Sequence, residues 1–88
     1  LLLDADSSNA KCLALADAEV VELIAKPGSK ITRRPVKELN LPTDITLGGV
    51  IHNGVGTIVS GNTQIQENDY VLVFCLDTAL SKLDRWFG

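Results

Sequence analysis

The most regular pattern in the chain is a continuous apolar run, Tyr70–Leu76, which predicts a β-strand. Odd and even positions of the run are both apolar, as in a strand that lies in the middle of a sheet. The segment Cys12–Ala25 contains a second candidate, because its half from Ala18 to Ala25 is rich in β-branched residues. Both faces of that half are largely apolar, which predicts an inner strand or a strand that faces a partner subunit.

A β-hairpin is predicted in the middle of the chain. The segment Ile45–His52 is typical of a strand, and Val55–Ser60 returns after the dipeptide Asn53-Gly54. That dipeptide favours a two-residue turn, because both of its positions tolerate positive φ. After a further turn, Thr63–Gln66 is expected to be a brief extended piece.

Two helices are expected. Thr32 is a candidate N-cap for a short helix over Arg33–Leu39, with Pro35 tolerated in its first turn. Asp77 is the candidate N-cap of a last helix, whose apolar face comprises Ala79, Leu80, Leu83, Trp86 and Phe87. These elements predict an α+β fold: a small mixed or antiparallel sheet, a short helix after the first strand, and a C-terminal amphipathic helix.

Composition narrows the class of protein. Of the 88 residues, 45% are hydrophobic and 22% are charged, which is typical of one globular domain. Aromatic residues make up only 5%, so the core must be aliphatic, and a subunit interface would help to complete it. The formal net charge of −3 disfavours nucleic acid as a partner. No apolar run approaches the roughly 20 residues of a membrane-spanning helix.

The beginning of the chain predicts a domain boundary. Residues 1–11 are expected to be the linker remnant of an absent upstream domain, and residues 12–88 to form the domain itself. Cys12 and Cys75 form no metal-binding spacing, and one histidine does not complete a Cys/His zinc site. Two reduced, buried thiols are therefore expected, as in a cytoplasmic protein.

No catalytic motif is complete. A nucleophilic triad would need His52, the one histidine, with Ser60 and Asp69 around it, but no nucleophile-elbow motif is present. The glycines of Gly54-Val55-Gly56 begin like a phosphate-binding fingerprint, which fails at Val59 and lacks a following long helix. The sequence therefore predicts no enzyme.

Five of the eight basic residues lie within twelve positions: Lys26, Lys30, Arg33, Arg34 and Lys37. Such a cluster is usually a solvated surface. The alternative is a docking face for an acidic partner or for a ligand phosphate.

Four segments, in order, resemble the RCK-C (TrkA C-terminal) domain of prokaryotic potassium-transport regulators. They are Ala18–Glu22, Gly49–Gly54, Gly61–Ile65, and Glu67–Phe74, which is similar to the family's Gly-Asp hallmark before an aliphatic strand. The chain departs from the family pattern at Asn68, where glycine is usual, at His52, where the basic residue is arginine, and at Asn53, where an acid is usual. It also lacks the family's proline near Ser60.

The resemblance implies the C-terminal regulatory domain of a cytoplasmic gating subunit in a Trk-type potassium uptake system. Such domains pair as homodimers, and the subunit assembles on the cytoplasmic face of a membrane-embedded, potassium-conducting protein. A Rossmann domain upstream would hold a nucleotide such as NAD or ATP, whereas no cofactor is expected in this segment. Some relatives bind cyclic dinucleotides between the two copies.

The ligand-facing edge suggested by this resemblance comprises Val50, Ile51, His52, Asn53, Gly61 and Asn62. Aliphatic and backbone groups would hold a nucleobase there, and His52 would reach a phosphate. In the alternative hypothesis these residues form only a hairpin and a dimer seam, and the domain is a ligand-free dimerisation module. A regulatory domain of another cation transporter or antiporter is the third hypothesis.

Overall fold

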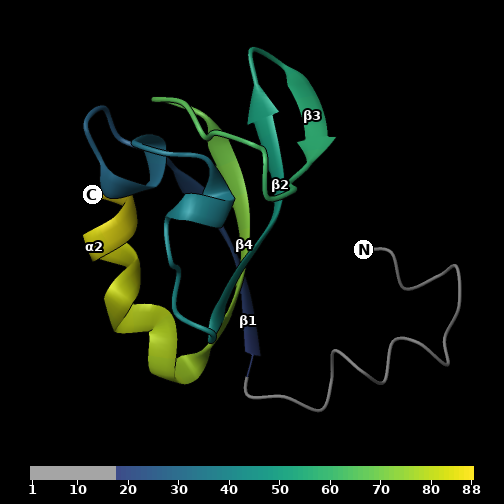
Figure 1. Ribbon diagram of the computed structural model, residues 1–88. Coiled ribbons are helices and arrows are strands. Elements are labelled where there is room, and N and C mark those ends of the chain that lie inside the picture. The colour runs from purple at the N-terminus through teal and green to yellow at the C-terminus, as the bar shows by residue number, and fades with distance from the viewer. Residues whose placement is uncertain (1–17) are drawn as a thin grey trace, which may run out of the picture.

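A computed structural model describes residues 18–88, and these form a four-stranded sheet covered on one side by short helical segments (Figure 1). The strands are β1 (Ala18–Ile24), β2 (Ile45–His52), β3 (Val55–Ile58) and β4 (Tyr70–Leu76). Their order in the sheet is β1-β4-β2-β3, and every neighbouring pair is antiparallel. The predicted linker over residues 1–11 and the predicted environment of Cys12 lie outside the described residues. Within the described residues, no helix has the length and apolar character needed to cross a membrane.

The predicted bounds of β2 and β4 are confirmed, and β4 is central, between β1 and β2. Of the two alternatives for β1, the inner strand is wrong, because β1 lies at an edge of the sheet, and the strand that faces a partner subunit stays a prediction. Its second apolar face is exposed to solvent: Val20 and Ile24 are 46% and 48% exposed. The apolar pattern of β1 therefore reflects an uncovered face and not a position between two strands.

The β2–β3 hairpin turns at Asn53-Gly54, as predicted. Both residues have positive φ, 50° for Asn53 and 81° for Gly54. The returning strand ends at Ile58, two residues earlier than predicted. Asn68 also has a positive φ, 69°, so asparagine supports the turn before β4.

The predicted helix over Arg33–Leu39 is absent: this range contains one 3-10 turn, η3 (Val36–Glu38), and another, η2 (Lys30–Thr32), precedes it. Pro35 explains the break, because proline lacks an N–H and favours an extended residue before it. The first two backbone N–H groups of η3 bond to a distant segment, from Val36 to the Thr63 carbonyl at 2.8 Å and from Lys37 to the Gly61 carbonyl at 2.9 Å.

The predicted extended piece Thr63–Gln66 is not a strand of the sheet. This irregular segment contacts η3 and inserts Ile65, which is fully buried, into the core. The last helix also differs from the prediction: a 3-10 segment, η4 (Asp77–Lys82), precedes a short α2 (Leu83–Phe87). The N-cap residue is Leu76 and not Asp77.

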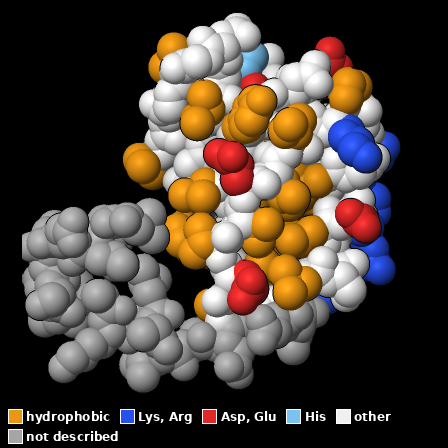
Figure 2. All heavy atoms as spheres, turned by 180° about the vertical axis from the view of Figure 1, so that it is seen from behind, with side chains coloured by type: hydrophobic (Ala, Val, Ile, Leu, Met, Phe, Trp, Pro, Cys, Tyr) orange, Lys and Arg blue, Asp and Glu red, His pale blue; other side chains and the backbone are white. Residues whose placement is uncertain are grey.

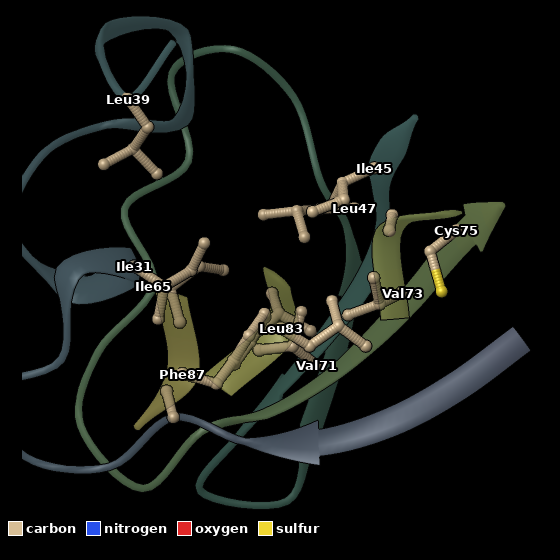
Figure 3. Packing of buried hydrophobic residues seen from close by; sticks show 13 residues of the cluster. Ile31, Leu39, Ile45, Leu47, Ile65, Val71, Val73, Cys75, Leu83 and Phe87 are labelled. Carbon is tan, nitrogen blue, oxygen red and sulfur yellow. The ribbon is translucent and has the colours of Figure 1, made fainter. Parts of the chain in front are cut away.

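The core lies between the sheet and the helical segments (Figure 3). The strand side chains that face inward meet Ile31 of η2, Ile65, and two residues of α2, Leu83 and Phe87. Val71 and Val73 of β4 are fully buried at its centre. Cys75 is buried in the same cluster, which confirms the predicted burial of this thiol. The α+β class is thus confirmed, with a sheet that is wholly antiparallel.

Candidate functional site

The side of the sheet that faces away from the helical segments is largely apolar and exposed. Because side chains alternate along strands, the residues on this outer face are given by the strand register. Val20 lies opposite Phe74, and Ile24 lies opposite Tyr70, which in turn lies opposite Ile51. The hydrophobic residues of the outer face that are more than a third exposed are Val20, Ile24, Ile51, Ile58, Tyr70, Leu72 and Leu76. Figure 2 shows hydrophobic side chains spread over one side of the molecule, with lysine and arginine near its margin.

A groove of about 380 Å³ crosses this outer face. Two glycines create it: Gly49 lies between Leu72 and Ile58, and Gly56 lies opposite Ile51. Without side chains at these positions, the larger residues stand around a hollow. Tyr70 and the exposed carboxylate of Glu22 also line it, and no lysine, arginine or histidine from the described residues does. The groove thus combines apolar walls with one acidic group.

The six residues proposed for a ligand-facing edge are distributed over three places. Ile51 lines the outer groove, and Val50 borders it although its side chain is buried in the core. His52 and Asn53 form the end of the hairpin, and the imidazole lies on the inner side of the sheet. Gly61 and Asn62 lie in the turn after β3, which contacts Lys37 of η3. Whether any of these positions binds a ligand stays a prediction.

His52 makes a contact that local sequence does not predict. Its Nδ1 meets Oδ1 of Asp69, seventeen residues further along the chain, in the turn that precedes β4. The Asp69 carboxylate is buried, and its Oδ2 accepts the backbone N–H of Gln66 at 2.8 Å. The imidazole is 44% exposed, and its Nε2 lies 3.2 Å from the amide nitrogen of Asn53.

Of the three residues considered for a triad, only His52 and Asp69 come together. The backbone N–H of Ser60 donates to Oγ1 of Thr63 at 2.9 Å, and the two hydroxyl groups lie 3.4 Å apart. Ser60 is therefore engaged in its own turn. The pairing of His52 with Asp69 required the register of β2 against β4, and the one sequence signal for it was an aspartate immediately before a strand.

The basic cluster is partly engaged with neighbouring groups of the domain. The Lys30 ammonium lies 5.9 Å from the centre of the Trp86 ring, and Arg33 donates to the Gly28 carbonyl at 3.2 Å. Arg34 forms an exposed ion pair with Glu38 at 3.8 Å. These contacts are compatible with a solvated surface, and the docking of an acidic partner on this cluster stays a prediction.

Comparison with known proteins adds to this geometry. The chain is 30% identical over 70 residues to a Trk system potassium uptake protein TrkA homolog of Methanosarcina mazei, covering 80% of this chain and 16% of that protein. It is 33% identical over 69 residues to a TrkA homolog of Pyrococcus horikoshii, covering 77% of this chain and 30% of that protein. It is 29% identical over 69 residues to the Trk system potassium uptake protein TrkA of Azorhizobium caulinodans, covering 78% of this chain and 15% of that protein.

The aligned region thus spans less than a third of each of these relatives. The model of the TrkA-C domain matches residues 20–88, which cover all four strands, the two 3-10 turns between β1 and β2, and the C-terminal helical segments. The chain belongs to the TrkA-C domain family.

Proposed function

We propose that this chain is a non-enzymatic regulatory domain of a Trk-type potassium uptake system, and that it works by self-association through the outer face of its sheet. The similarity to Trk system potassium uptake proteins supports the first part. The domain would act at the cytoplasmic side of the membrane, within a larger subunit that contacts a potassium-conducting protein. A coupling free energy would link the conformation of the subunit to that of the potassium-conducting protein.

The exposed apolar outer face is the observation that carries this proposal. Its hydrophobic residues come from all four strands and are contiguous in the strand register. Large exposed apolar patches on a globular domain mark interaction sites, and a two-fold dimer would bury the same patch on both copies. A stable interface needs roughly 800 Å² from each partner.

A small-ligand site is the second part of the proposal. The end of the hairpin joins the outer groove, through Ile51, to the polar pair His52 and Asn53. Gly61 and Asn62 would contribute backbone groups from the neighbouring turn. A nucleotide held across two copies would then couple ligand occupancy to the orientation of the paired domains.

The self-association proposal is tested by sedimentation of the 88-residue chain and of two matched variants. Leu72→Glu introduces a charge at an outer-face leucine that is 38% exposed. Leu80→Glu makes the same change at a leucine that is 43% exposed and lies on η4, outside the sheet. A dimer that is lost in Leu72→Glu and kept in Leu80→Glu supports the proposal. A monomeric parent chain, or equal behaviour of the two variants, refutes it.

A further inference from the structure

The strongest unexplained feature of the described residues is the carboxylate of Asp69, which is buried beside an exposed imidazole. A buried carboxylate is stable only when its oxygens accept hydrogen bonds or meet a positive charge. Each oxygen of Asp69 has its own partner, since Oδ2 accepts the backbone N–H of Gln66 and Oδ1 meets Nδ1 of His52. The carboxylate itself is held by the turn over residues 66–69, where Asp69 N–H also donates to the Gln66 carbonyl at 3.1 Å.

This arrangement determines which nitrogen of the imidazole carries the proton. An ionised carboxylate accepts hydrogen bonds and donates none, so Nδ1 must be the donor to Oδ1. In the neutral ring the proton is then on Nδ1, and the one lone pair of Nε2 is a hydrogen-bond acceptor. The neighbouring Asn53 agrees with this assignment, because its amide nitrogen, a donor, lies 3.2 Å from Nε2.

We propose that Asp69 is a positioning residue for His52, which holds the neutral imidazole as the Nδ1–H tautomer and presents Nε2 as a hydrogen-bond acceptor at the end of the hairpin. Because Nε2 has one lone pair, a ligand donor would take the place of the Asn53 amide there, and the group that fits is a hydroxyl or an N–H donor, such as a sugar hydroxyl or an amine. This assignment of ligand chemistry rests on the proposed ligand site at the hairpin. The tautomer itself does not, because it follows from contacts within one copy of the chain.

The test is long-range ¹⁵N–¹H correlation NMR of the full chain, at a pH high enough to keep the imidazole neutral. His52 is the single histidine, so one pair of ring nitrogens is observed. The expected result is a proton on Nδ1 and a pyridine-type signal for Nε2. A majority of the Nε2–H tautomer in the parent chain overturns the proposal without any variant.

Asp69→Asn is the decisive variant. Its amide oxygen would accept the Gln66 N–H, and its amide nitrogen would then donate to Nδ1, which forces the ring proton onto Nε2. We expect the majority tautomer to change from Nδ1–H to Nε2–H. If Asp69→Asn folds and keeps the parent tautomer, Asp69 does not position the ring.

Asn53→Gly is the matched control. Glycine keeps the positive φ of this turn position, and the amide beside Nε2 is removed. The Nδ1–H tautomer should persist, whereas its loss would assign the positioning role to Asn53 and refute the proposal. These readouts need neither ligand nor dimer. The two proposals can therefore fail separately. If the chain does not self-associate but shows the expected tautomer, the proposed function is refuted and the positioning role of Asp69 stands.

Discussion

Phe74 of β4 lies with its ring against Gly48 of β2, at the point where the two strands change register. The register of β2 against β4 is regular as far as Leu47, which lies opposite Val73, and it continues with Gly49 opposite Leu72. Gly48 is therefore the extra residue of a bulge. A Cβ added at Gly48 would overlap the Phe74 ring. The absence of a side chain at Gly48 therefore allows an aromatic ring to cover the bulge.

Gly48→Ala is expected to destabilise the domain by about 1–3 kcal/mol, because the ring of Phe74 must leave its rotamer. Gly49→Ala is the matched control, since its Cβ would make only an ordinary contact, 3.5 Å from the Thr57 carbonyl oxygen. Urea unfolding measures both free energies. Combining Gly48→Ala with Phe74→Leu should restore part of the loss, and equal losses for the two alanine variants would contradict the bulge explanation.

Ile65→Ala is expected to cost about 2–5 kcal/mol of unfolding free energy, because it leaves a cavity in the core. Ile65 is fully buried although it belongs to no strand or helix. Ile58→Ala makes the same change at a side chain that is 84% exposed, and it should alter the stability of the monomer by less than about 0.5 kcal/mol. The comparison is made by urea unfolding at a concentration where the chain is monomeric. A small effect at Ile65 would mean that the segment over residues 63–66 is not anchored in the core.

Two ion pairs should differ in their contribution to the free energy of unfolding. Lys82 of η4 bonds to the Asp44 carboxylate at 3.2 Å, and its side chain is 37% exposed against 14% for Asp44. Lys82→Met is expected to cost on the order of 1 kcal/mol, less at high salt. Arg34→Met removes a more exposed pair with Glu38 and should cost close to zero. Urea unfolding at low and high salt measures the free energy of unfolding of both variants. A larger loss of unfolding free energy in Arg34→Met than in Lys82→Met would contradict this prediction.

A nucleotide ligand should raise the unfolding temperature of the chain. At 100 times its dissociation constant, a ligand stabilises by about 2.7 kcal/mol. Each kcal/mol moves the midpoint of a domain of this size by roughly 4–8 °C. A panel of NADH, ATP, AMP and cyclic dinucleotides should therefore contain one compound with a shift on the order of 10 °C.

The same shift should be reduced in His52→Ala, which removes the polar group at the hairpin end. Lys82→Met serves as a control outside the hairpin. A flat panel would support the ligand-free dimerisation module. A shift that survives His52→Ala unchanged would move the ligand away from the hairpin edge.

The sequence by itself determined the elements whose signals are local. The seven-residue apolar run predicted the central strand β4 with its observed bounds, and Asn53-Gly54 predicted the hairpin, because positive φ at two successive residues is a property of those residues alone. The strand and the hairpin share the property that each signal depends on neighbours within a few positions. The family was identified from the order of four short segments, and the match over residues 20–88 confirms the family.

The tertiary structure decided everything that depends on distant partners. Two apolar faces of β1 are compatible with a central strand or an edge strand, and only pairing with β4 on one side distinguishes them. The helix expected over Arg33–Leu39 is replaced by the 3-10 turn η3, whose first two N–H groups bond to carbonyl acceptors more than twenty residues away. The contact of His52 with Asp69 arises because β2 and β4 are neighbours in the sheet. Strand register brings residues together across long stretches of chain, and no local pattern encodes it.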